Sequence, residues 1–376
     1  MNFEKAIRKV PDFPKPGILF YDVTSIFNNP GAYKAVVKEM LSIYKDTAVD
    51  GVIAVDQEGL RLLLEGVGPL TVEGEAKPVD ASGLIAMLRQ RWGVVPDDVS
   101  AKYQWWLTHK DIVSTLAKAA IERVQGGLGA QDMLRLAKSL KTAVDGKHLL
   151  VYSRDPALRP ALAAAGVDGA ILPSRSDYLM VVDTNMGFNK VNPYVEQRLD
   201  YAVELDSNGS AIAHLSAIYS NTATVRLAEC VHGPVYGKTY DDMMQRCYWD
   251  YVRVYAPLGS TALLGPDSPE WETATDGDKT TFATLFVVAP GDAESLTLDY
   301  LLPAGIVTHQ GKTSTYRLLL QKQAGTAAIP LQLSLALPAG ARLSTSTPPP
   351  NSVDSNRLVF DLLLDKDQTL EVSYGR

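Results

Sequence analysis

The sequence predicts an α+β, multi-domain protein, with an α/β N-terminal half followed by an all-β, sandwich-like C-terminal region. The chain has 376 residues, more than one small core organises, which predicts two or three domains. Helical and strand patterns alternate up to about residue 195, and short alternating segments separated by turns follow. The content of 46% hydrophobic and 21% charged residues is that of a globular protein and excludes a disordered or collagen-like chain.

Charge and hydropathy narrow the expected partners. The net charge of −7 gives no chain-wide basic surface, so we expect no nucleic-acid partner. No window reaches the roughly 18 apolar residues of a membrane helix, so we expect no membrane span in this chain. The first ten residues, MNFEKAIRKV, are charged and lack the apolar core of a signal peptide, so we predict neither a signal nor an anchor.

In the N-terminal half, helical spacing alternates with short apolar runs. Asp80 stands before a helical stretch and is placed to cap it, and the glycines at 126–129 separate two helices. Pro156 favours the first turn of a further helix. The predicted helices cover 31–45, 60–65, 81–92, 99–124, 131–143 and 155–165, and the predicted strands cover 51–55 and 147–153.

In the C-terminal half, period-two alternation predicts strands. The segments 198–205 and 210–220 flank Ser207-Asn208-Gly209, which predicts a β-hairpin. Further strands are expected at 249–255, 282–288, 295–302, 315–321, 330–337, 358–364 and 369–374.

The sequence contains few motifs that are typical of a catalytic or ligand-binding site. No phosphate-binding loop, nucleophile elbow or zinc motif occurs, so we predict no cofactor and no metal. Arg89 and Arg91 are candidates to clamp a phosphate, although residues two apart on a helix do not share a face. The acidic pairs 97–98 and 241–242 suit a cation or acid–base chemistry, but more commonly such residues cap helices. Clustered aromatic residues such as Trp105 and Trp249 suit carbohydrate or partner recognition if exposed, and core packing otherwise.

The two cysteines, Cys230 and Cys247, lie 17 residues apart in a segment rich in glycine and tyrosine. An oxidising compartment favours a disulfide between them, and a reducing one favours two buried thiols. A metal site with His232 is the third alternative, with ligand spacing unlike known zinc motifs.

The segment at about 5–50 carries Pro11-Asp12-Phe13-Pro14 and Phe20-Tyr21-Asp22-Val23-Thr24, and it resembles the N-terminus of adenine phosphoribosyltransferase. The resemblance implies an arm that covers a purine with Leu19, Phe20 and Tyr21. Glu58 stands where that family has an arginine, and the family's acidic phosphoribosyl-pyrophosphate loop is missing. We therefore expect a vestigial arm at 1–48 and rank phosphoribosyl transfer as the last candidate activity.

The remainder, about 49–376, resembles the DUF4012 family of bacterial envelope proteins. The stretches DGVIAVDQEGLRLLLEGVGPLTVEG, HLLVYSRDPALRPALAAAGVDG and YLMVVDTNMGFNKVNPYVEQRLDYAVEL carry the resemblance. It implies an extracytoplasmic location and favours the disulfide between Cys230 and Cys247. With it we predict an α/β domain at 49–185, a β-rich region at 186–376, and a natural or artificial splice to the N-terminal arm.

A similarity of pattern to LytR–CpsA–Psr transferases supplies one mechanism. It implies catalytic roles for Arg89, Arg91 and Asp98 in transfer of glycan from polyprenyl pyrophosphate. Lys102, His109 and Lys110 stand where that family has arginines, and lysine does not reproduce a bidentate grip. The leading expectation is therefore a non-catalytic extracytoplasmic module that binds an envelope glycan or protein. The transferase is the alternative.

Overall fold

The structure, a computed structural model, describes residues 8–11, 19–22, 50–92, 96–108, 111–233, 237–265 and 270–375. The chain divides into two compact units. The N-terminal unit comprises Met1–Val52 and Tyr152–Pro160, and the main unit comprises Ile53–Val151 and Ala161–Arg376. The helix predicted at 31–45 lies outside the described residues.

Two short strands are described in the N-terminal unit. Strand β1 (Arg8–Pro11) pairs antiparallel with β2 (Leu19–Asp22), with Arg8 opposite Asp22 and Pro11 opposite Leu19. The backbone of Leu19, Phe20 and Tyr21 therefore lies in β2, while their side chains lie outside what the structure describes.

The helical part of the chain begins after the first strand of a small two-stranded sheet. Strands β3 (Gly51–Val55) and β4 (Leu149–Ser153), each predicted from an apolar run, pair with each other. Asp56 caps α3, because its Oδ1 accepts a hydrogen bond from Gly59 N at 2.7 Å. The helices are α3 (Gln57–Val67), α4 (Leu84–Trp92), α5 (Val99–Thr108), α6 (Asp111–Gln125), α7 (Ala130–Asp145) and α8 (Arg159–Ala164).

Apolar residues on one face of α3 build a small core with α4 and α6. Its centre is formed by Leu64, Val67, Leu84 and Leu116, all 0–1% exposed. Helical spacing places these side chains on the inner faces of their helices, so burying them stabilises the helical part.

In this helical part, the described caps, turns and helix ends agree with the predicted ones at some positions and differ at others. Asp80 does cap the helical stretch, accepting from Gly83 N at 2.8 Å. The glycine break is a turn between α6 and α7, where Gly127 has φ 91°. The single helix predicted at 99–124 is described as two helices, α5 and α6, with residues 109–110 outside the description. Helix α8 is shorter than predicted because residues 155–158 form turns.

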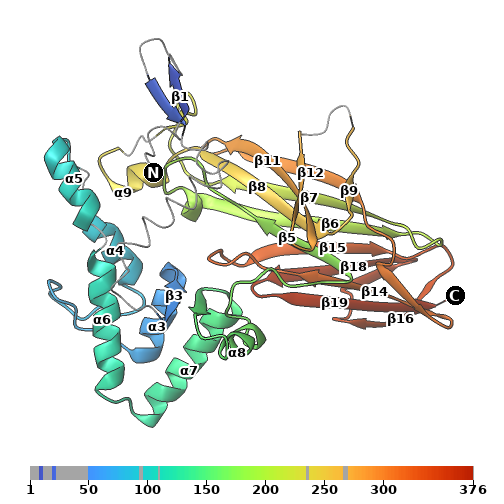
Figure 1. Ribbon diagram of the computed structural model, residues 1–376, viewed down its shortest axis with the longest axis horizontal. Coiled ribbons are helices and arrows are strands. Elements are labelled where there is room, and N and C mark those ends of the chain that lie inside the picture. Colours follow the sequence, from blue (N-terminus) through green and yellow to red (C-terminus); the bar gives the residue numbers. More distant parts are fainter. Residues whose placement is uncertain are drawn as a thin grey trace. The chain divides into compact units, whose positions relative to one another are not determined.

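Two sheets form the β-sandwich of the main unit (Figure 1). One has the order β10-β11-β8-β5-β14-β19-β16, with β13 paired to β14, and the other has the order β17-β18-β15-β6-β7-β12-β9. Helix makes up 23% and strand 39% of the chain, so the α+β class with a sandwich-like C-terminal region is confirmed. The strands are β5 (Asp177–Val182), β6 (Val195–Leu205), β7 (Ala211–Asn221), β8 (Tyr248–Pro257), β9 (Thr261–Ala262), β10 (Glu272–Asp276), β11 (Lys279–Val288), β12 (Ala293–Leu301), β13 (Val307–Gln310), β14 (Thr313–Leu320), β15 (Ile329–Ala336), β16 (Arg342–Thr347), β17 (Ser352–Asp354), β18 (Arg357–Leu364) and β19 (Gln368–Gly375). Two short helices, 3-10 helix η2 (Asn192–Tyr194) and α9 (Tyr240–Met244), lie in its connections.

The hairpin predicted around Ser207-Asn208-Gly209 joins β6 to β7, with Leu205 opposite Ala211. Along β7 every second side chain is buried, which is the alternation expected of a sheet with one face in the core. Inward residues of both sheets, including Tyr201, Phe282 and Phe360 at 0–1% exposure, form one continuous core. Strand β5 belongs to this sandwich although it precedes residue 186. The limit between domains predicted at 185–186 stays a prediction.

Candidate functional site

Cys230 and Cys247 form a disulfide, with an S–S distance of 2.09 Å and a Cα–Cα distance of 5.7 Å. Neither cysteine is a free thiol, so the buried-thiol and metal alternatives are wrong. His232 is engaged elsewhere, because its Nε2 donates a hydrogen bond to Met186 O at 2.9 Å. The disulfide joins the loop after β7 to the residue before β8, and Cys247 lines one hollow while Cys230 lines another.

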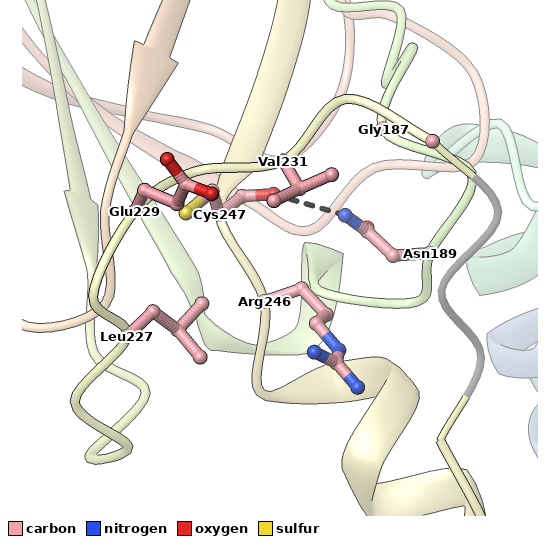
Figure 2. A pocket seen from close by; sticks show the side chains of 8 residues that line it. Gly187, Asn189, Leu227, Glu229, Val231, Arg246 and Cys247 are labelled. Atoms are coloured by element: carbon pink, nitrogen blue, oxygen red, sulfur yellow. Dashed lines mark hydrogen bonds between the residues drawn. The ribbon is translucent and has the colours of Figure 1, made fainter.

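The first hollow is a pocket of about 80 Å³ (Figure 2). The lining side chains come from three segments that are distant in sequence: the β5–β6 connection, the loop after β7, and the junction of α9 with β8. The residues are Gly187, Asn189, Leu227, Glu229, Val231, Gly233, Arg246 and Cys247. Asn189 is fixed in place because its Nδ2 donates to Cys247 O at 2.9 Å, the bond drawn in Figure 2.

The second hollow is an open cleft of about 470 Å³ between β8, β11 and β12. Its aromatic wall is Trp249, whose ring lies 4.7 Å from the ring of His232, measured between centroids. Asp292 and Glu294 supply two exposed carboxylates. The remaining lining residues are Cys230, Val287, Val288, Ala289 and Ala293.

The three candidate catalytic residues, Arg89, Arg91 and Asp98, have different described contacts. Arg89 lines a largely apolar groove of about 300 Å³ with Asp56, Gln57, Leu60 and other side chains. Arg91 does not line it. Its Nε pairs with Glu75 Oε1 at 2.6 Å, and its Nη2 donates to Gly74 O. Asp98 accepts a hydrogen bond from Ala101 N at 2.8 Å and so caps α5.

Four residues stand where the resembled families carry arginine: Glu58, Lys102, His109 and Lys110. Glu58 pairs with Arg61 one turn further along α3, with 2.7 Å between Oε1 and Nη2. The side chains of Lys102, His109 and Lys110 lie outside the described residues. The acidic pair at 241–242 has a structural role in part, because Asp242 forms a capping box with Thr239 at the start of α9.

Two carboxylates inside the sandwich were not predicted. Asp183 accepts a hydrogen bond from the Tyr219 hydroxyl at 2.7 Å, and burial raises its pKa to about 6. Asp250 is 0% exposed, and its carboxylate interacts with the Tyr248 side chain and the Thr184 backbone, which offset only part of the cost of burial. Burial, followed by the negative charge of Asp183, raises the pKa of Asp250 to about 8. Strand alternation was the available signal, since Asp250 shares the inward register of Tyr248 and Val252.

A third carboxylate, Asp177, is also fully buried. Its Oδ2 accepts from the hydroxyls of Tyr316 at 2.5 Å and Tyr201 at 3.0 Å, and its Oδ1 accepts from Tyr178 N at 2.7 Å. Burial raises the pKa of Asp177 to about 6, opposed by these hydrogen bonds. Its oxygens are satisfied by neighbours, which makes it a structural residue of the core.

Across residues 50–375, where described, no three histidine, cysteine or acidic side chains gather closely enough to hold a metal ion. In the same part of the chain, no helix has the length and apolar character needed to cross a membrane.

The N-terminal region is similar to adenine phosphoribosyltransferases. The enzyme of Treponema denticola is 50% identical over 56 residues, which are 15% of this chain and 30% of that protein. The enzyme of Solibacter usitatus is 41% identical over 58 residues, 15% of this chain and 34% of that protein. The chain thus spans about a third of the length of these relatives, which fits a chimeric N-terminus.

No family model matches the chain, so the resemblance to DUF4012 finds no support. Among solved structures, a putative nutrient-binding protein from Legionella pneumophila aligns with a TM-score of 0.29 and 10% identity, covering 52% of this chain and 70% of its own. The M1 zinc metallopeptidase of Deinococcus radiodurans aligns with a TM-score of 0.23 and 9% identity, covering 48% of this chain and 42% of its own.

Proposed function

We propose that the protein is an extracytoplasmic cell-envelope protein whose β-sandwich is a non-catalytic glycan-binding module. The observation that carries the proposal is the cleft beside the disulfide, where Trp249 faces the same space as Asp292 and Glu294. An indole surface packs against the apolar face of a sugar ring, and carboxylates accept hydrogen bonds from its hydroxyl groups.

The disulfide supports the compartment. Disulfides form and persist in oxidising surroundings, and they are rare in the cytosol of ordinary bacteria. The Cys230–Cys247 link also borders the cleft, so the same bond that suits an exported protein holds the proposed binding surface.

Binding is tested by cosedimentation of the full chain with isolated bacterial cell-wall glycan. Removing the Trp249 ring in Trp249→Ala should weaken binding by about 2 kcal/mol, a factor of about 30 in Kd, as expected of a central aromatic contact. Tyr103→Ala is the aromatic control, because Tyr103 is 63% exposed on α5 and does not line the cleft. Equal binding by all three proteins would contradict the proposal.

Location is tested separately by cell fractionation with maleimide labelling. An exported protein should label with maleimide only after reduction, since both cysteines are joined. Thiols that label in the cytosolic fraction without reductant would contradict the extracytoplasmic assignment.

Transfer of polyprenyl-pyrophosphate-linked glycan is the second candidate. Its supporting observation is the groove where Arg89 borders apolar side chains, a combination that suits a phosphate attached to a hydrocarbon chain. A short polyprenyl pyrophosphate with Mg²⁺ should raise the melting temperature, and Arg89→Ala should abolish the rise. A rise that is equal in Arg89→Ala would contradict it.

Phosphoribosyl transfer is the third candidate and concerns the N-terminal segment alone, where the phosphoribosyltransferase similarity lies. It is tested by incubating the protein with adenine and phosphoribosyl pyrophosphate and measuring AMP. We expect no AMP above the protein-free control.

A further inference from the structure

The pocket of Figure 2 holds two opposite charges that do not neutralise each other. Arg246 and Glu229 both line it, and Figure 2 shows that they come from different segments, Glu229 from the loop after β7 and Arg246 from the residue before Cys247. Within the described part of the chain, no salt bridge or hydrogen bond engages the carboxylate of Glu229, and none engages Nη1 or Nη2 of Arg246. The charge of Arg246 also acts on the carboxylate of Asp242, and Glu229 is exposed. Two opposite charges that line one small cavity nevertheless suit a ligand that carries both.

The backbone around Arg246 fixes where its guanidinium can reach. Its Nε donates to Asp242 O at 2.8 Å, and its own carbonyl accepts from Asn221 Nδ2 at 2.9 Å. The nearby carboxylate of Asp242 is already engaged, because its Oδ2 accepts from the backbone nitrogens of Lys238 and Thr239, each at 2.8 Å. The two terminal nitrogens of Arg246 therefore remain to grip an incoming carboxylate in the bidentate manner of guanidinium groups.

The walls set a limit on size. Leu227 and Val231 give apolar surface, and the cavity is small, at about 80 Å³. Gly187 lies close against Asn189, since a Cβ there would lie 2.5 Å from Asn189 Nδ2. Cys247 in the wall is tied to Cys230, which stands between Glu229 and Val231, so the disulfide holds the two charged sides of the pocket together.

We propose that this pocket binds a small zwitterion, a free α-amino acid of glycine or alanine size. Arg246 receives the carboxylate, Glu229 receives the ammonium group, and Leu227 and Val231 contact the methyl group of alanine. Charge complementarity on both ends gives specificity against ligands that carry only one charge. The inference concerns a different hollow from the proposed glycan cleft and does not depend on it.

Isothermal titration calorimetry of the full chain tests the proposal with four probes: alanine, leucine, alaninamide and N-acetylalanine. We expect alanine to bind, and leucine to bind at least about tenfold more weakly because its side chain exceeds the cavity. Alaninamide lacks the carboxylate and N-acetylalanine lacks the ammonium group, so each should also lose about tenfold or more.

Variants assign the two charges. Arg246→Gln and Glu229→Gln should each weaken alanine binding about tenfold or more, whereas Arg226→Gln, an exposed arginine of the same loop, should leave it unchanged. Glu229→Gln should discriminate less between alanine and N-acetylalanine, a readout that a folding defect does not produce. Dithiothreitol should weaken binding by freeing the two walls from each other.

Absence of alanine binding to the unaltered protein overturns the proposal. So does alanine binding that Glu229→Gln leaves unchanged, since Glu229 has no described bond whose loss would disturb the fold. Loss of glycan binding with alanine binding intact would contradict only the proposed envelope-glycan function.

Discussion

The ammonium group of Lys322 donates a hydrogen bond to the carbonyl of Gly146, 176 positions earlier in the chain, at 3.1 Å. Gly146 ends α7, and Lys322 follows β14, so this bond links the helical part to the sandwich within the main unit. The same ammonium also contacts Gln323 O at 3.2 Å and Thr326 O at 2.6 Å. Lys322 is 1% exposed, and three carbonyls replace the water that burial removes.

Lys322→Met should lower the free energy of unfolding by about 1–3 kcal/mol, because it leaves buried carbonyl oxygens without a donor. Urea denaturation at pH 7 measures the difference. Lys366→Met is the matched control, since Lys366 is exposed. An equal loss in both variants would mean that the buried contacts add nothing to stability.

The carboxylates of Asp183 and Asp250 should make stability depend on pH. Both pKa values are raised above the ordinary 3.8, to about 6 and about 8, so the folded state holds protons that the unfolded chain has released. Stability should therefore fall as the pH rises from about 4 to about 8. Asp250→Asn should flatten this fall, while Glu196→Gln, at an exposed position of β6, should not. Urea denaturation at pH 5, 6.5 and 8 measures the slope, and parallel slopes in all proteins would contradict the assignment.

At higher pH, Lys322 acts with the opposite sign. Burial lowers its pKa from 10.5 to about 8, so between these values the unfolded chain binds a proton that the folded state has lost. Stability should rise with pH in that window. Lys322→Met should abolish the rise between pH 8 and pH 10, measured by the same denaturation series. A rise that persists in the variant would assign it to other groups.

Asp177→Ala should destabilise the sandwich by about 3 kcal/mol or more. The substitution leaves the hydroxyls of Tyr316 and Tyr201 without their acceptor inside the core and opens a cavity. Tyr316→Phe removes only one donor and should lose about 1–2 kcal/mol. Thermal unfolding with near-ultraviolet circular dichroism measures both, and an Asp177→Ala loss no greater than that of Tyr316→Phe would contradict the network.

The double variant Cys230→Ser, Cys247→Ser should lose about 3 kcal/mol, because the link closes a loop of 17 residues in the unfolded chain. Unfolding with and without dithiothreitol gives the comparison. The unaltered protein should respond to reductant and the double variant should not. A response of equal size in both would place the effect outside this bond.

Local sequence patterns were enough to predict helices, strands and turns, but not the two hollows beside the disulfide. The hairpin at 206–210, the caps at Asp56 and Asp80 and the alternating strands follow from residues close in sequence, where turn chemistry and periodicity act. The pocket joins Gly187 and Asn189 to Glu229 and Arg246, and long-range strand pairing together with the Cys230–Cys247 disulfide brings those segments together.

Asp250 shows a conflict between two rules that predict burial from sequence. The alternation of β8 places it on the inner face, yet a carboxylate is ordinarily expected on the outer one. Burial of Asp250 follows from this alternation, which also buries Tyr248 and Val252. Likewise, the pattern that suggested Arg89 and Arg91 as a pair could not show that Arg91 turns to Glu75.

The order of strands has a consequence for how the protein is made. Strand β5 lies between β8 and β14, and β6 pairs in parallel with β15. A central strand of each sheet therefore pairs with a strand about 130 residues further along the chain, which is synthesised later. During synthesis the ribosome must pass residue 320 before β5 is flanked on both sides. Such non-local pairing folds slowly and leaves apolar strand edges uncovered in the meantime. Nascent chains stalled before β14 should therefore be chaperone clients, and release of the C-terminal strands is the event that closes the sandwich.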